Sequence, residues 1–138
     1  MKNSSAYRSQ SLQNATGPQL VEACFREARV QLAHVRRNLE AGTTASTYEP
    51  LERVRKIYTH LYSTLDLEAG GDLAQRLQAL YAFVIETTLE ISSTYDEGTL
   101  ATLDKINTDM LNAWSHVAHR EWPATAARIP TGPFQVRA

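Results

Sequence analysis

Residues 65–74 read LDLEAGGDLA, and this stretch decides how the rest of the chain is interpreted. Glycine tolerates the left-handed backbone that closes a helix, and Gly70 and Gly71 stand at the centre of the stretch. Asp72 follows them and can accept the first free N–H groups of a new helix. Apolar residues at spacings of three and four lead into the stretch and out of it. The segment therefore predicts a tight corner between two amphipathic helices.

Four apolar stripes with helical spacing run along the chain. They cover residues 20–39, 51–65, 73–91 and 100–117. The second stripe alternates spacings of three and four, which is the heptad seam of packed helices. No alternating apolar and polar run between turn signals predicts a strand. Four amphipathic helices with short links indicate an all-α fold, namely an antiparallel four-helix bundle.

Local signals predict where the helices begin and which residues form the core. Thr16 and Pro18 fit the start of the first helix, and Pro50 opens the second. Thr99 is the expected cap of the fourth helix, after a break at residues 96–98. The expected core stripes of the last two helices are Leu73, Leu77, Leu80, Val84 and Ile91, then Leu100, Leu103, Asn107, Met110, Trp114 and Val117.

The two ends of the chain differ in composition from the helical part. Residues 1–15 are rich in Ser, Asn and Gln, which predicts a mobile N-terminal arm. Residues 121–138 hold three of the five prolines and have no helical period, so we expect an extended or disordered tail. The helical bundle domain is expected to span residues 16–120.

Bulk properties limit the classes of function. At 138 residues the chain fits one domain with its own core. A formal net charge of −1 argues against a sequence-independent nucleic-acid binder, which needs a basic face. The single cysteine, Cys24, cannot form an internal disulfide. No signal peptide is evident, and no run approaches the roughly 18 apolar residues of a membrane span. We expect a cytoplasmic protein that does not insert into membranes.

The sequence offers little for catalysis or metal binding. A di-iron helical bundle needs Glu three residues before two of its histidines, and none of the four histidines has one. His116 and His119 share a helix face but have no obvious third ligand. Cys24 lies on an apolar stripe, where a buried, unreactive thiol is expected. We therefore expect no enzyme, no metal and no cofactor.

Apolar residues exceed what one stripe per helix requires. Tyr62 lies beside the second stripe, Tyr81 and Phe83 beside the third, and Ile106 and Leu111 beside the fourth. Core-facing helices normally carry a wide stripe, so these residues can simply widen the core. Alternatively, some of them line outer grooves that accept amphipathic helices of a partner. Both interpretations remain open at this point.

Several short motifs, in order, resemble the flagellar secretion chaperone family FliS. Ala6-Tyr7 is similar to the family's A-Y, and residues 15–21 are similar to its A-S/T-P-x-x-L-V helix entry. Residues 65–83 resemble its S-L-D-x-E-x-G-G-[ED]-[IL]-A-x-x-L-x-x-L-Y-x-[FY] run, and residues 112–114 its R-x-A-W. The likeness covers roughly residues 6–117. It breaks at Phe25, Arg26 and Glu27, where the family usually has Tyr, Asp and Gly.

The resemblance implies an export chaperone. Such a protein binds the disordered C-terminal segment of flagellin, prevents premature polymerisation and delivers the subunit to the flagellar type III secretion apparatus. The N-terminal arm, in which Tyr7 matches the family tyrosine, is implied to pack over part of the same surface when no client is bound. An export gate component and an anti-sigma factor are further expected partners. The chain itself is expected as a monomer or a homodimer.

Seven residues are the predicted partner contacts. They are Tyr7, Leu12, Tyr58, Tyr62, Leu77, Tyr81 and Leu111. A core position remains the alternative for Tyr58, Leu77 and Tyr81, because they lie on or beside the seams. The changes at 25–27 also keep a second function open, a regulatory or adaptor bundle with another export client or an anti-sigma factor. A small enzyme or a metal-binding bundle is the third possible function.

Overall fold

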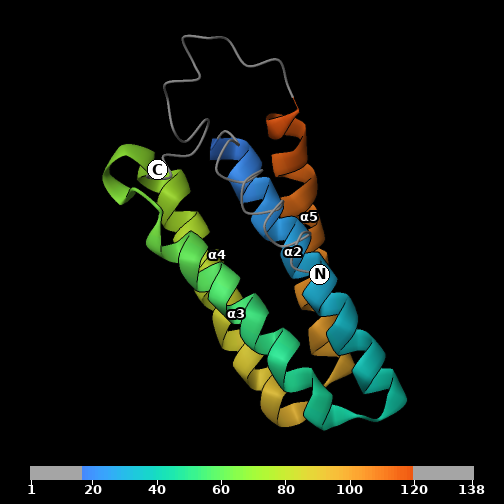
Figure 1. The fold of residues 1–138 in the computed structure, drawn as a ribbon. Helices are drawn as coiled ribbons and strands as arrows, with labels where there is room; N and C mark the ends of the chain where they lie inside the picture. The colour runs from blue at the N-terminus through green and yellow to red at the C-terminus, as the bar shows by residue number, and fades with distance from the viewer. Residues whose placement is uncertain (1–16, 120–138) are drawn as a thin grey trace.

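The computed structural model describes residues 17–119, and this part of the chain forms four long helices (Figure 1). They are α2 (Gly17–Ala41), α3 (Tyr48–Ser63), α4 (Leu67–Thr94) and α5 (Glu97–Ala118), with a short 3-10 turn, η1 (Thr44–Thr47), between α2 and α3. Residues 17–119 contain no β-strand. The predicted all-α four-helix bundle is confirmed.

The helices are arranged as two pairs. Figure 1 shows α2 beside α5, although they are the first and last helices of the described chain, and α3 beside α4. Because the links are short, consecutive helices run in opposite directions. α2 also packs on α3, but α4 and α5 contact each other only sparsely. One side of the bundle is therefore much less tightly joined than the other three.

An aromatic cluster holds three of the helices together. The ring of Tyr58 from α3 lies 5.9 Å from that of Phe25 on α2 and 5.8 Å from that of Tyr81 on α4, both in edge-to-face geometry. All three residues are at most 2% exposed. Such aromatic pairs contribute about 0.5–1.5 kcal/mol each beyond the burial of their area. The cluster thus fixes the spacing of α2, α3 and α4.

A buried amide joins the fourth helix to this cluster. Asn107 of α5 is fully buried, and its Oδ1 accepts a hydrogen bond of 2.7 Å from the Tyr58 hydroxyl. Its Nδ2 donates to the backbone carbonyl of Phe25 at 3.0 Å. Burial raises the pKa of Tyr58, so its hydroxyl keeps the proton that it donates. One side chain therefore satisfies polar groups of two other helices inside the core.

The corner at residues 65–74 is present, but its details differ from the prediction. α3 ends at Ser63, and the capping side chain is Asp66, whose Oδ1 accepts from the Ala69 N–H at 3.2 Å. Helical backbone starts at Leu67 and is interrupted at Gly71, where φ is +55°. The cap therefore lies six residues before the expected Asp72. Gly71 provides the positive φ that the sequence predicted at this corner.

The turn between α4 and α5 has a different cap from the expected one. Tyr95 adopts the left-handed conformation at the end of α4, with φ of +53°. Asp96, and not Thr99, caps α5: its Oδ2 accepts 2.8 Å and 2.7 Å hydrogen bonds from the backbone N–H and the hydroxyl of Thr99. These bonds stabilise the carboxylate and lower the pKa of Asp96. Thr99 is therefore the donor to the cap and not the cap itself, because Asp96 stands three residues earlier.

The expected core stripes of α4 and α5 were partly wrong. Leu73 is 43% exposed and Leu80 half-buried, whereas Tyr81 faces the core. In α5, Leu111 is buried and Met110 only half-buried. Adjacent positions on a helix are about 100° apart, so two neighbours can both border the apolar stripe. Packing against the neighbouring helices then decides which of the two is buried.

Several predictions lie outside the described residues. They concern the cap at Thr16, the arm at residues 1–15 and the tail at residues 121–138. Within residues 17–119, no helix is both long enough and apolar enough to cross a membrane.

Candidate partner-binding surface

The structure separates the seven predicted contact residues into three groups. Tyr7 and Leu12 lie outside the described residues. Tyr62 is 39% exposed on α3. The other four, Tyr58, Leu77, Tyr81 and Leu111, are buried in the core. For these four the structure favours the core interpretation, because a partner could reach them only if the bundle opened; their contact with a partner stays a prediction.

An apolar cavity lies between α2 and α3, and we call it the α2–α3 groove. Its volume is about 630 Å³, and it is lined by Leu20, Ala23, Cys24, Arg26, Glu27, Val30, Ile57 and His60. Cys24 and Ile57 are half-buried and pack against the core, while Leu20 and Val30 are 40% and 46% exposed. The groove therefore has an apolar floor that continues onto exposed apolar side chains of α2.

The rim of the α2–α3 groove is charged on the α2 side. The Arg26 Nη2 donates to the Glu22 Oε2 at 2.7 Å, and the Glu27 Oε2 accepts from the Gln31 Nε2 at 2.7 Å. Burial raises the pKa of the Cys24 thiol, which disfavours the reactive thiolate form. The groove suits an apolar side chain with polar neighbours.

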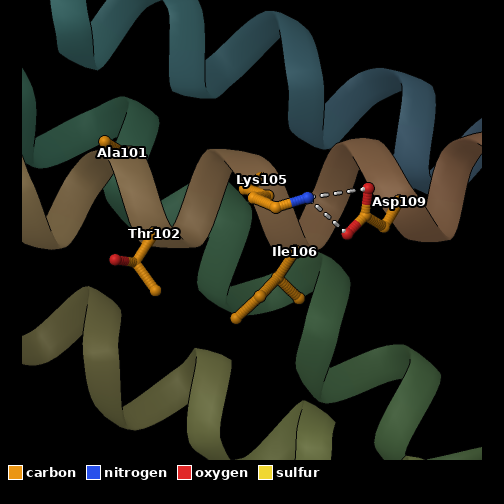
Figure 2. A pocket seen from close by; sticks show the side chains of 5 residues that line it. All are labelled: Ala101, Thr102, Lys105, Ile106 and Asp109. Atoms are coloured by element: carbon orange, nitrogen blue, oxygen red, sulfur yellow. Dashed lines mark hydrogen bonds and ion pairs between the residues drawn. The ribbon is translucent and has the colours of Figure 1, made fainter.

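A second apolar surface follows the sparse contact between α4 and α5. A pocket of about 410 Å³ on α5 is lined by Ala101, Thr102, Lys105, Ile106 and Asp109. Figure 2 shows Thr102 and Ile106 pointing from α5 toward α4, and the Lys105 Nζ bridging to Asp109 along α5, 3.1 Å from its Oδ2. The α5 side of this surface is thus apolar, with an ion pair beside it.

Helical geometry identifies the α4 side of the same surface. The Thr99 hydroxyl of α5 lies 3.5 Å from the Glu90 Oε2, so the face of α4 that carries Glu90 is directed toward α5. Phe83 stands seven residues before Glu90 and therefore on the same face. It is 48% exposed, and Leu80, one turn earlier, is half-buried. We infer from this position that Phe83 and Leu80 form the α4 side of the surface that Thr102 and Ile106 form on α5, and we call this surface the α4–α5 groove.

Sequence reasoning did not select Leu20, Val30 or Phe83 as contacts. Leu20 was assigned to the first stripe, and Val30 to no stripe at all. Phe83 was noted as one of the residues that widen the third stripe. The sequence did contain a signal for such contacts. An apolar residue that lies off the core stripe of an amphipathic helix is expected to be exposed.

The charged residues near the end of α5 serve a structural role. Glu22 is buried; burial raises its pKa, but hydrogen bonds with Ser115 and Arg26 and the charge of His119 outweigh this, and the net pKa is lowered. The His119 Nε2 lies 3.2 Å from the Glu22 Oε2. These contacts fasten the end of α5 to α2. Within residues 17–119, no three His, Cys, Asp or Glu side chains gather as a metal site.

Comparison with known proteins gives a consistent result. A model of the family described as "Flagellar protein FliS" matches residues 1–121. The flagellar secretion chaperone FliS of Salmonella typhimurium (strain LT2) is 27% identical over 109 residues, which is 78% of this chain and 81% of that protein. The protein of the same description from Vibrio cholerae serotype O1 is 25% identical over 118 residues, covering 86% and 87%.

Proposed function

Because the chain belongs to the FliS family of flagellar proteins, we propose that it is a flagellar export chaperone that binds the C-terminal segment of flagellin. In this role it prevents premature polymerisation and delivers the subunit to the flagellar type III secretion apparatus. Two relatives described as flagellar secretion chaperones support the chaperone role. The cytoplasm, where the client is made, is the proposed location.

The observation that carries this proposal is the pair of apolar grooves on the flanks of one bundle. The α2–α3 groove and the α4–α5 groove lie on different sides of the four helices. An amphipathic helix binds by laying its apolar face into such a groove. A disordered client loses chain entropy when it becomes ordered, so it needs a large contact area to bind well. A segment that wraps the bundle and enters both grooves would supply that area.

We assign the client contacts to exposed and half-buried residues. Leu20, Val30 and Ile57 would meet the client in the α2–α3 groove, and Phe83 and Ile106 in the α4–α5 groove. Tyr62, predicted from the sequence, remains a contact because its ring is exposed and can bury while its hydroxyl stays in water. Binding of an export gate component and of an anti-sigma factor is part of the same proposal.

Calorimetric titration with a C-terminal flagellin segment from the same cell tests the proposal. We expect saturable binding with a large negative heat-capacity change, because apolar surface is buried. Val30→Asp should weaken binding by about tenfold, as a charge in an apolar contact does. Thr59→Asp is the matched control: Thr59 is exposed on α3, outside both grooves, and should leave binding unchanged. Absence of heat with the wild-type chain would contradict the proposal.

One observation favours a second candidate, an adaptor bundle with a different client. Arg26 and Glu27, which replace the family's usual Asp and Gly, both line the α2–α3 groove. The groove rim therefore differs in charge from the family pattern at the place where a client would lie. Parallel titrations with flagellin and with an anti-sigma factor distinguish the two: preference for the second by tenfold or more would favour the adaptor role.

A further inference from the structure

The end of the described chain lies beside the α2–α3 groove. His119, the last described residue, contacts Glu22 through its Nε2 at 3.2 Å. The same Glu22 oxygen accepts the 2.7 Å hydrogen bond from Arg26, and Arg26 lines the groove. The chain therefore leaves α5 one turn of α2 away from the groove wall.

The residues that follow have the composition of a segment that could cover this groove. Residues 120–138 contain Trp122, Ile129, Phe134 and Val136 among three prolines. They also contain three arginines and one glutamate. The family model ends at residue 121, so the family match does not account for residues 122–138. Nothing in the proposed chaperone role requires them.

We infer that residues 120–138 turn back across α2 and place the ring of Trp122 in the α2–α3 groove, over Cys24 and Ile57. Trp122 is three positions after His119, a reach of about 10 Å, which matches the roughly 10–12 Å width of the helix to be crossed. Pro123 disfavours helical backbone at Trp122, and α5 itself ends at Ala118. The reach is therefore compatible with the groove.

The groove offers what an indole ring needs. Its floor is apolar, and Trp buries about 150–250 Å² when it is enclosed. The Arg26 guanidinium stands at the rim, where it can lie over the ring face. The Glu27 carboxylate, also at the rim, has acceptor capacity for the indole N–H in addition to its bond from Gln31. The chemistry of floor and rim thus fits Trp better than an aliphatic side chain.

The charges at this end of the bundle also favour an approach of the tail to the α2–α3 groove. Figure 1 shows the corner between α3 and α4 at the same end of the bundle as the start of α2 and the end of α5. Glu68 and Asp72 are exposed at this corner. The C-terminus of α3, which carries a negative partial charge, lies beside the groove at His60. Arg128 and Arg137 of the tail would be attracted to these carboxylates and to this helix end.

The chain's only cysteine provides a direct test, since Cys24 lines the groove. In the full chain without client, we expect Trp122→Ala to raise the rate at which a maleimide reagent modifies Cys24 by about fivefold or more, because only the uncovered fraction reacts. Leu89→Ala, which removes an exposed apolar side chain on α4 outside the α2–α3 groove, is the control variant and should leave the rate within about twofold. An unchanged rate in Trp122→Ala, or an equal rise in Leu89→Ala, would overturn the inference.

Tryptophan fluorescence gives an independent readout. Trp114 is buried in the core, so the difference between the wild-type spectrum and that of Trp122→Phe reports on Trp122. Ala23→Arg fills the α2–α3 groove and should shift this emission toward that of a solvated ring. Ala101→Arg makes the same change in the α4–α5 groove and should not. The reverse pattern would place the tail on the other groove and refute the inference. Neither readout involves flagellin, so failure here is distinct from failure of the proposed function.

Discussion

Helix α5 has two edges that are built in different ways. The edge toward α2, the closed edge, is fastened by the Arg36–Asp104 ion pair, by the Asn107 bond to the Phe25 carbonyl, and by the contact between Glu22 and His119. The edge toward α4, the open edge, has sparse contacts, and apolar side chains such as Ile106 and Phe83 remain partly or largely accessible there. The same helix is thus sealed on one side and left unfilled on the other.

The difference indicates which surface is available to a partner. Full burial of a Phe side chain contributes about 1.5–3 kcal/mol, and the bundle does not gain this at Phe83, which is 48% exposed. The closed edge, in contrast, combines closer packing with polar bonds between α2 and α5. An apolar edge that the fold leaves uncovered is typical of a surface that binds something else. The proposed client position follows from this contrast.

The largest expected effect comes from breaking the core bond beside the closed edge. Asn107→Ala would leave the buried Tyr58 hydroxyl without its acceptor, remove the side-chain bond to the Phe25 carbonyl and create a cavity. We expect a loss of about 3 kcal/mol in the free energy of unfolding. Urea denaturation measures it. Tyr58→Phe, which removes only one of the two bonds, should cost clearly less; equal losses would contradict the assigned network.

The next prediction concerns the open edge. Phe83→Asp should weaken binding of the flagellin segment by about tenfold or more while the free energy of unfolding stays within about 0.5 kcal/mol. Gln75→Asp is the matched control, since Gln75 is exposed on α4, eight residues earlier and about a quarter-turn away around the helix. Calorimetric titration and urea denaturation separate the two effects. If both variants bind equally well, the open edge is not the client surface.

A smaller change is expected at the N-terminus. If residues 1–15 cover part of the client surface when no client is bound, Tyr7→Ala should change the client affinity several-fold, because the competing segment is weakened. Titration of the wild type and the variant under the same conditions measures it. Identical affinities would contradict a role of the arm in client binding and would not affect the proposed role of the grooves.

The smallest expected effect is a pH dependence at the closed edge. Because the folded pKa of Glu22 lies below its usual 4.5, the stability from its bonds is present above that value and is lost as the pH falls through the folded pKa. Glu22→Gln should therefore cost about 1 kcal/mol near neutral pH and much less at about pH 3. Denaturation at both pH values tests this, with Glu86→Gln, exposed on α4, as the control. A cost that does not change with pH would contradict the prediction.

The sequence predicted the helices well because apolar spacing is a property of each helix alone. The core positions Val54, Leu61, Val84 and Trp114 follow from that spacing. Positions at the border of a stripe could not be assigned in this way, as Leu80 against Tyr81 and Met110 against Leu111 illustrate. Their burial depends on which neighbour the helix meets and at what distance. The sparse contact between α4 and α5 could not be predicted from a single sequence, because it depends on how the four helices pack.

The helix caps were missed for a related reason. Asp66 and Asp96 each stand three residues before the N–H that they bind, and both were overlooked in favour of a residue nearer the apolar stripe. Capping begins before the first core residue, so a stripe alone marks the helix start too late. The grooves, in turn, were inferable only as a surplus of apolar residues. Their location required the packing of four helices against each other.

Site-specific photo-crosslinking tests the central claim most directly. A benzoylphenylalanine placed at Phe83, in the full chain with the flagellin segment added, should crosslink to that segment, because the ring would lie in the contact. The same group at Gln75 should not crosslink. Crosslinking at both positions, or at neither while titration shows binding, would contradict the account and place the client elsewhere on the bundle.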